Sequence, residues 1–290
     1  MSLFAISNFQ AAPLLKARKA DLQTAKTSPD LNLTMVDVAL DEVGVVYPEP
    51  FDVQLTWAQV TQVAADETHC FRFDGDELVK INTFSADTNR AISLYPTVSA
   101  PTMVLAGFPM HRIKDTNPYQ DTLQKIKAAS PVSGLVLDTA TGLGYTATMA
   151  AKTAQHVTTC DIDSGVLEIC RFNPWSTELF DNPKITQLHG DVFDLIEEME
   201  EGTYTRIIHD PPTVSIAGDL YSGDFYVELY RVLRKGGRLF HYIGDPRSGL
   251  GSRTTLGVVK RLREAGFREV EEVKIIQTPT GSISLYRGRR

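Results

Sequence analysis

The second part of the chain alternates short apolar segments of strand type with segments of helical spacing, and this alternation limits the fold more than any other feature. Five such strand–helix units follow one another from about residue 114. Their strands read PVSGLVLDTA, HVTTCDI, KITQLHG, TRIIHD and GRLFHYIG. Strands joined through helices pair in parallel, so the series predicts a doubly wound, mostly parallel α/β sheet with helices on both faces. Two last strands around the turn TPTG predict a terminal antiparallel hairpin at one edge.

The first part of the chain has a different pattern. Apolar and polar residues mostly alternate with a period of two, and the turn sequence DGDE separates the strand-like CFRF and LVKINTF. One segment, LTWAQVTQVAAD, has helical spacing. We therefore predict a small β-rich N-terminal module at residues 1–112 and an α/β domain at residues 113–290.

The composition argues against several classes of protein. The 290 residues carry a formal net charge of −7, which disfavours a protein built mainly to coat nucleic acid. No apolar run approaches the roughly 20 residues that span a bilayer, and the first residues lack the basic and apolar blocks of a signal peptide. The three cysteines show no CxxC spacing, so reduced thiols are expected. We expect a cytoplasmic protein with no membrane partner.

Acidic residues stand at or just past the ends of the first four strands of the α/β domain. They are Asp138, Asp161, Asp191 and Asp210. In doubly wound sheets, ligands bind beyond the carboxyl ends of the strands. Four carboxyl groups at one edge are hard to explain by solubility, so we expect a binding site there.

A glycine-rich segment, LDTATGLGYTA, follows the first of these strands. Gly142 and Gly144 allow backbone amides to approach a ligand closely, and Asp138 precedes them. Asp161 lies 161 − 142 = 19 residues after Gly142, a spacing that suits a carboxylate holding ribose hydroxyls. The segment GLGYTA also fits the GxGxxA pattern of nicotinamide-binding folds, which taken by itself is a weak match.

The third acidic residue suits an adenine ring. Asp191 could accept a hydrogen bond from the adenine amino group, and Ile162 and Val192 could pack against the ring.

These features resemble the class I S-adenosylmethionine-dependent methyltransferases, from about Asp115 to Arg290. The resemblance implies a Rossmann-like methyltransferase sheet and S-adenosyl-L-methionine as the cofactor. The motifs FPMHRIKDTNPY, NPWSTELFDNP and DPPT, together with the β-rich module, are more specifically similar to a group of predicted methyltransferases best represented in archaea. The resemblance places Asp138, Gly142 and Gly144 in the loop around the methionine part of the cofactor, Asp161 at the ribose and Asp191 by the adenine. Thr139, Ile162 and Val192 are further candidates for cofactor contacts. The upstream Asp138, the terminal hairpin and the DPP turn favour this methyl donor over a nicotinamide.

The segment HDPPT resembles the [DN]PP[YFW] turn of amino-group methyltransferases. In those enzymes the acid or amide and a proline carbonyl accept hydrogen bonds from the target amine, which implies this role for Asp210 and Pro211. Thr213 stands where that family usually has an aromatic residue that stacks on a planar base. We therefore expect a small-molecule acceptor rather than a nucleic acid, with RNA or protein as the less favoured partners.

Further candidates lie near the same edge. His209 precedes the DPPT turn, Tyr242 ends the fifth strand, and His111 could face the substrate. Arg112 could pair with the carboxylate of the cofactor. No HxH or HxxxH pair supports a metal site, so we expect none. The segment 244–255 has the composition of a mobile loop that could act as a lid.

The leading hypothesis is an enzyme that methylates a nitrogen held by Asp210 and the two following prolines. One alternative is aminopropyl transfer from decarboxylated S-adenosylmethionine, as in spermidine-synthase-like proteins, whose loop is usually richer in glycine and acids than DTATGLG. Another is a non-catalytic protein that binds the cofactor or docks a partner through its N-terminal module. A homo-oligomer is compatible with each of these.

Overall fold

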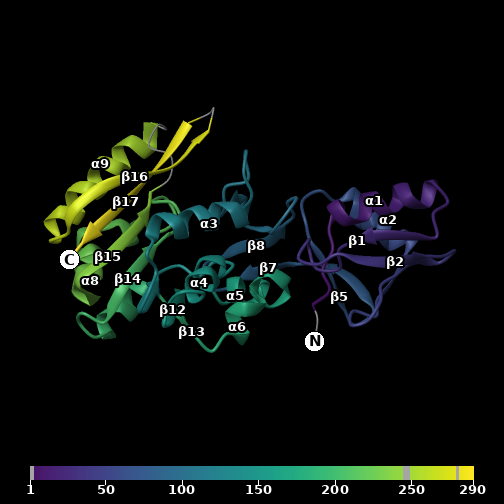
Figure 1. Cartoon of the computed structure of the whole chain (residues 1–290), viewed down its shortest axis with the longest axis horizontal. Coiled ribbons are helices and arrows are strands. Elements are labelled where there is room, and N and C mark those ends of the chain that lie inside the picture. Colours follow the sequence, from purple (N-terminus) through teal and green to yellow (C-terminus); the bar gives the residue numbers. More distant parts are fainter. Residues whose placement is uncertain (1–2, 244–248, 279–280) are drawn as a thin grey trace. The chain divides into compact units, whose positions relative to one another are not determined.

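The structure, a computed structural model, describes residues 3–243, 249–278 and 281–290 (Figure 1). The chain divides into two compact units. The first unit comprises Met1–Asp121 and Ser164–Glu178, and the second comprises Thr122–Asp163 and Leu179–Arg290. The domain boundary that the sequence predicts between residues 112 and 113 stays a prediction.

The first unit is rich in β-structure. One antiparallel sheet has the order β1-β2-β3-β4, another has the order β10-β9-β8-β7, and β5 pairs with β6 around the DGDE turn. The strands are β1 Thr24–Thr27, β2 Val36–Leu40, β3 Gly44–Val46, β4 Gln54–Thr56, β5 Phe71–Asp74, β6 Glu77–Lys80, β7 Asn82–Ser85, β8 Arg90–Tyr95, β9 Thr102–Leu105 and β10 Phe108–Pro109.

Helices α1 (Asn8–Lys19) and α2 (Trp57–Ala65) pack against the sheet formed by β1, β2, β3 and β4. Each begins at a capping box, in which a hydroxyl and a glutamine side chain satisfy backbone N–H groups of the first turn. Their apolar faces join the inner face of the sheet in one core, with Leu14, Val45 and Val60 fully buried.

Helix α5 (Ser164–Phe172) belongs to the first unit although it lies within the α/β part of the sequence. The Ser164 amide donates to Asp87 Oδ2 at 2.8 Å, and Thr83 Oγ1 donates to Glu168 Oε2 at 2.9 Å. These bonds join the helix to β7 and its following turn. The sequence pattern identified the helix but not this attachment.

The second unit is built on a seven-stranded sheet of order β13-β12-β11-β14-β15-β17-β16. The first five strands pair in parallel, and β17 is antiparallel between β15 and β16. This arrangement confirms a mostly parallel α/β sheet of Rossmann type. The strands are β11 Leu135–Asp138, β12 His156–Asp161, β13 Ile185–His189, β14 Tyr204–His209, β15 Leu233–Tyr242, β16 Arg268–Thr278 and β17 Gly281–Arg289.

Helices cover this sheet and complete its core. They are α3 Pro118–Ala129, α4 Tyr145–Ala151, α6 Thr177–Asp181, α7 Val192–Leu195, α8 Gly223–Val232 and α9 Gly249–Glu264. Helix α4 packs against β11, β12 and β13, whereas α8 packs against β15 and α9 lies along β16 (Figure 1). The core includes Ile207, Phe225 and Val258, none of which is exposed to solvent.

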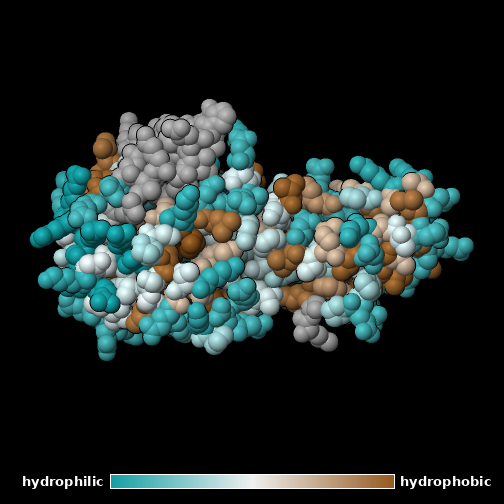
Figure 2. Space-filling model, viewed as in Figure 1, coloured by the Kyte–Doolittle hydropathy of each residue, from teal (hydrophilic) through white to brown (hydrophobic). Residues whose placement is uncertain are grey.

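Part of the predicted mobile loop is helical. Helix α9 begins at Gly249, so residues 249–255 belong to its first turns, and residues 244–248 lie outside the described part of the chain. Within the segments that the structure describes, no helix is both long and apolar enough to cross a membrane. Hydrophilic and hydrophobic residues are interspersed on the face of each unit that Figure 2 draws.

Candidate functional site

The four predicted carboxyl groups stand at one edge of the sheet in the second unit. Asp138 ends β11, Asp161 ends β12, and Asp210 follows the last residue of β14. Asp191 follows β13 by two residues and precedes α7. Because these four strands are parallel and adjacent, their carboxyl ends meet. We call the four residues the acidic edge.

Asp138 is fully buried. Its Oδ2 accepts a hydrogen bond from Thr159 Oγ1 at 2.8 Å, while its Oδ1 has no hydrogen-bond partner among the described residues. Burial raises the pKa of Asp138 to about 8, and the charges of Asp210 and Asp161 add to the rise. At neutral pH, therefore, most Asp138 carboxyl groups are protonated and one oxygen is left without a partner.

The two glycines of the loop after β11 have different roles. Gly142 has φ 49°, and a Cβ atom there would meet nothing within 4 Å. Gly144 has φ 74°, and its Cβ atom would lie 2.7 Å from Leu179 Cδ2. Gly142 therefore stands beside open space at the acidic edge, whereas Gly144 is required for close packing at the start of α4.

Asp161 is fixed by backbone amides. Its Oδ2 accepts from the Gly142 N–H at 2.9 Å and its Oδ1 accepts from the Asp163 N–H at 3.0 Å. Burial raises the pKa of Asp161 to about 6, against the opposing effect of these hydrogen bonds. The neighbouring Ile162 is 46% exposed. A half-buried carboxylate and an exposed aliphatic side chain thus lie side by side along the chain, as the predicted ribose and adenine contacts require.

Asp191 caps a helix. Its Oδ1 accepts from the Phe193 N–H at 2.9 Å, the first-turn bond of an N-cap. Val192 packs within the hydrophobic core rather than at the surface. The predicted adenine contact of Val192 is therefore not supported, because the apolar periodicity of α7 directs this side chain inward.

Asp210 forms an ion pair that the sequence analysis missed. Lys125 of α3 donates from Nζ to Asp210 Oδ2 at 2.7 Å, and the same Nζ lies 4.6 Å from the centre of the Tyr242 ring. The Lys125 side chain is only 5% exposed and that of Asp210 is 17% exposed. The predicted site residues Asp210 and Tyr242 are thus brought together around a buried ammonium.

A sequence signal for Lys125 exists. Thr122, Lys125, Ala128 and Ala129 are all buried, and their spacing of three and four residues defines one helix face. A lysine on such a face is rare unless it has a partner. The periodicity could have identified a buried lysine, although not the carboxylate with which it pairs.

The turn formed by Pro211 and Pro212 is fixed by a hydrogen bond from a tyrosine. The Tyr221 hydroxyl donates to the Pro212 carbonyl at 3.0 Å, and Pro211 is buried. Thr213, at the position of the usual aromatic residue, is exposed. The turn therefore keeps Asp210 at the end of β14 without supplying a stacking surface at residue 213.

The predicted catalytic role of His209 is opposed by its surroundings. The ring is fully buried; Nε2 donates to the Leu220 carbonyl at 2.9 Å, and Nδ1 accepts from Thr139 Oγ1 at 2.7 Å. Burial lowers the pKa of His209 to about 3. Both nitrogens form hydrogen bonds within the core, so His209 and Thr139 fix the end of β14. Their predicted roles at the substrate and the cofactor stay predictions.

His241, next to His209 in the sheet, is equally enclosed. Its Nδ1 lies 3.2 Å from the His209 carbonyl and its Nε2 lies 3.0 Å from the Tyr226 hydroxyl. A carbonyl can only accept, so Nδ1 carries the proton and Nε2 accepts from the tyrosine. Burial lowers the pKa of His241 well below its usual value.

His111 and Arg112 belong to the first unit. His111 Nδ1 lies 3.0 Å from Thr102 Oγ1, and Arg112 lies 3.4 Å from Asp121. Their predicted roles at the substrate and at the cofactor carboxylate stay predictions.

The acidic edge has the features that an adenosyl sulfonium donor needs. A buried carboxyl oxygen without a partner, a glycine beside open space and an anchored carboxylate follow one another at adjacent strand ends. Asp138, Gly142 and Asp161 are the residues that would hold such a donor.

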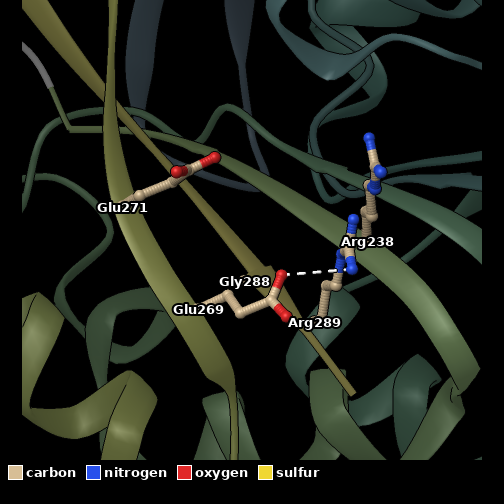
Figure 3. Close-up of a pocket in the computed structure, with 5 residues that line it drawn as sticks. All are labelled: Arg238, Glu269, Glu271, Gly288 and Arg289. Carbon is tan, nitrogen blue, oxygen red and sulfur yellow. Dashed lines mark ion pairs between the residues drawn. The ribbon is translucent and has the colours of Figure 1, made fainter.

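A separate hollow lies away from these residues, on β15, β17 and β16 (Figure 3). Arg238, Glu269, Glu271, Gly288 and Arg289 line it. Arg289 and Glu269 form an ion pair of 3.1 Å, so opposite charges largely neutralise each other there. Among the residues described, no group of three or more His, Cys, Asp or Glu side chains could hold a metal ion.

Comparison with known proteins gives a domain family and relatives. The model of the spermine/spermidine synthase domain matches residues 135–274. The uncharacterized protein MJ1233 of Methanocaldococcus jannaschii is 42% identical over 215 residues, which cover 73% of each chain.

Two further relatives match shorter segments. Putrescine N-methyltransferase 3 of Nicotiana tabacum is 26% identical over 140 residues, 47% of this chain and 37% of that protein. Polyamine aminopropyltransferase 2 of Streptomyces coelicolor is 28% identical over 116 residues, 38% of this chain and 21% of that protein.

Solved structures show the same fold. A spermidine synthase in complex with the transition state analogue AdoDATO superimposes with a TM-score of 0.59 at 18% identity, over 73% of this chain and 75% of that one. The spermidine synthase of Thermotoga maritima gives 0.56 at 19% identity over the same shares.

The comparisons support a transferase with a spermidine synthase-like domain. They favour the aminopropyltransferase alternative over the methyltransferase hypothesis that the sequence analysis put first. The narrower resemblance to the archaeal methyltransferases with a DPPT motif is not confirmed.

Proposed function

The chain belongs to the family of the Methanocaldococcus jannaschii protein MJ1233 and carries a spermine/spermidine synthase-like domain, and on this premise we propose that it transfers an aminopropyl group from decarboxylated S-adenosylmethionine to a small amine. One observation carries the proposal. The matched segment, residues 135–274, contains all four carboxyl groups of the acidic edge. The domain similarity and the candidate site therefore coincide.

The donor would be held by the first half of the acidic edge. Asp161 would accept hydrogen bonds from ribose hydroxyls, and the open space beside Gly142 would admit the donor chain. The tail of the decarboxylated donor ends in an ammonium and adds no anion next to four carboxyl groups. That ammonium would also give Asp138 Oδ1 the partner that it lacks.

The acceptor would be held by the second half. When bound, the donor supplies an electrophilic carbon attached to a sulfonium, a leaving group that is already activated. Asp210 would accept a hydrogen bond from the attacking amine and direct its lone pair toward that carbon. Positioning of this kind accounts for much of the rate in such displacements.

The test is incubation of the full chain with each donor, S-adenosylmethionine or its decarboxylated form, and a set of amines. Mass spectrometry of the products distinguishes an added aminopropyl group from an added methyl group. We expect aminopropyl transfer, and tighter binding of 5′-methylthioadenosine than of adenosylhomocysteine. Absence of any transfer with either donor would contradict the proposal.

Replacement of Asp210 by asparagine tests the role of its carboxylate. We expect Asp210→Asn to lower kcat by about 10²- to 10⁴-fold, with a much smaller change in donor affinity. Asp219→Asn, which alters an exposed acid in the following segment, is the matched control and should keep full activity. If the protein is not catalytic, the wild-type protein and both variants will show no turnover.

A second candidate is N-methyl transfer from S-adenosylmethionine. The DPPT turn and the similarity to a putrescine N-methyltransferase favour it. The same incubation decides between the two functions, because a methyltransferase would form methylated products with S-adenosylmethionine and not with its decarboxylated form.

A further inference from the structure

Three arginines lie side by side across adjacent strands of the second unit. Arg206 of β14 pairs in register with Arg238 of β15, and Arg238 pairs with Arg289 of β17. Residues paired directly across neighbouring strands project from the same face of a sheet. We call these three residues the arginine row. Arg206 lies near the amino end of β14, so the row is separate from the acidic edge at the carboxyl ends of the parallel strands.

The hollow of Figure 3 opens beside the arginine row. Arg238 and Arg289 line it, and their side chains lie next to each other in Figure 3. Glu269 pairs with Arg289 at 3.1 Å, and Glu271 is the other carboxylate at the hollow. Arg238 is half-buried and forms no hydrogen bond or ion pair with any residue that the structure describes. The ion pair therefore neutralises Arg289 but leaves Arg238 without an anion.

Arg206 uses only part of its guanidinium group for contacts with the protein. Its Nε donates to the Pro131 carbonyl at 2.5 Å, and its Nη1 donates to the Thr205 carbonyl at 2.6 Å. Within the described segments, its Nη2 has no hydrogen-bond partner. Two carbonyls thus fix the side chain and leave donors for a ligand.

The three charges of the arginine row oppose one another. Burial lowers the pKa of Arg206, and the charges of Arg238 and Arg289 lower it further. Like charges directly opposite each other destabilise a sheet. An anion bound at the row would remove this repulsion.

The chemistry of the row favours a phosphate group. A guanidinium group binds phosphate oxygens through two parallel hydrogen bonds. Neighbouring strands are about 4.8 Å apart, so two guanidinium groups of the row can contact one short chain of phosphates. A long polyanion such as RNA would pass the carboxylates of Glu269 and Glu271, which would repel it.

We propose that the arginine row binds a compact phosphate anion that carries several negative charges. The anion lies between Arg206 and Arg238, where the Nη2 of the first and the whole guanidinium of the second are available. It joins β14 to β15. The inference does not depend on the proposed function, because no residue of the acidic edge takes part.

The test is calorimetric titration of the full chain at low ionic strength, where charge interactions are little screened. The probes are orthophosphate, inorganic triphosphate and cytidine triphosphate, with a short oligouridine RNA for comparison. We expect triphosphate to bind about tenfold more tightly than orthophosphate, or better, because it reaches more guanidinium groups. Equal binding of cytidine triphosphate would support a phosphate chain on a larger molecule, and binding of the inorganic anion alone would support a free one. Failure of triphosphate to bind, or tighter binding of the RNA, overturns the inference.

Replacement of Arg238 assigns the binding to the arginine row. Arg238→Gln should lower the affinity for triphosphate about tenfold or more, because it removes the guanidinium that lacks a partner. Arg263→Gln, at an exposed arginine of α9, makes the same change in net charge and should bind within about twofold of wild type. Equal affinities of these two variants would show that net charge alone attracts the anion, and would overturn the inference.

Replacement of Glu269 has the opposite expected effect. Glu269→Gln removes the carboxylate that pairs with Arg289 and repels an anion, so the affinity for triphosphate should rise about threefold or more. Glu264→Gln, at an exposed acid of α9, is the control for net charge and should stay near the wild-type affinity. Damage to the fold cannot imitate a gain in affinity. An equal gain in both variants would contradict the inference.

Discussion

The carboxyl group of Asp138 has no contact with solvent, and this burial governs when it carries a charge. Its pKa, raised to about 8 by burial, is far above the value of about 4 for an exposed aspartate. Between these two values the folded protein holds a proton that the unfolded chain has released. The stability that this group contributes is fully present below pH about 4 and is lost as the pH rises through about 8.

Asp138→Asn tests this behaviour at a single residue. Asparagine can still accept the hydrogen bond from Thr159 but has no proton to lose. The unfolding free energy of the variant should therefore not show the decline that Asp138 causes as the pH rises. Relative to wild type, the variant should gain at most ~1.4 kcal/mol per pH unit between pH about 4 and 8. Hydrogen exchange of β11 amides in the ligand-free protein, corrected for the intrinsic rate, measures it.

Single residues also show what a sequence pattern can and cannot reveal. Asp210 could be placed from sequence because two prolines end its strand. Lys125 could be assigned to a buried helix face, but its pairing with Asp210 across 85 residues depends on tertiary packing. His209 and Val192 are buried in the core, which sequence could not show, since a position near a strand end does not say which way the side chain points.

At the scale of the element, the loop between β11 and α4 carries two glycines with left-handed backbones and different neighbours. Alanine at Gly144 would collide with Leu179, whereas alanine at Gly142 would project into open space. We expect Gly144→Ala to lower the free energy of unfolding by about 2–4 kcal/mol. Gly142→Ala should cost about 1 kcal/mol for backbone strain alone.

The two variants should lose ligand affinity in the opposite order, with the larger loss for Gly142→Ala. Gly142→Ala fills the space where the donor would lie, so its affinity for 5′-methylthioadenosine should fall about tenfold or more. Titration calorimetry on the full chain measures this affinity, and the stable fraction of Gly144→Ala should bind within about threefold of wild type. Normal binding by Gly142→Ala would remove this loop from the donor site.

Helices and strands could be predicted where a single local sequence pattern determines them. The five strand–helix units and the terminal hairpin follow from periodicity and turn residues, and all occur. The attachment of α5 to the first unit, through Asp87 and Thr83, was not predictable because it depends on hydrogen bonds between distant segments. Residues 249–255 are helical although their composition suggested a loop, which shows that residue composition is a weak guide to local structure.

At the scale of the whole molecule, the fold class was predictable but the order of the two leading functions was not. Methyl and aminopropyl transfer both use a carbon attached to the same sulfonium at the same sheet edge. Strand order and the glycine loop are therefore common to enzymes of both kinds. Neither of these two features indicates which carbon is transferred. The ion pair of Lys125 with Asp210, at the end of β14 where the proposed function places the acceptor, belongs to the tertiary structure and could not be read from either pattern.

The second unit holds buried groups with opposite effects on its acid stability. Burial raises the pKa values of Asp138 and Asp161 to about 8 and about 6, and it lowers those of His209 and His241. As the pH falls, each carboxyl group binds its proton earlier in the folded state and so stabilises it. Each histidine binds a proton below pH about 6.5 only when unfolded, and so destabilises the fold.

Between pH about 6 and 4.5, two carboxyl groups oppose two histidines, so these four contributions to the stability of the second unit should cancel. His209→Gln removes one histidine while its amide can still donate to Leu220 and accept from Thr139. The variant should therefore gain up to ~1.4 kcal/mol for each pH unit of acidification in this range, whatever its offset from wild type. Both tryptophans, Trp57 and Trp175, lie in the first unit, so hydrogen exchange of β14 amides is the appropriate probe. A flat profile for His209→Gln would show that the buried histidines do not balance the carboxyl groups.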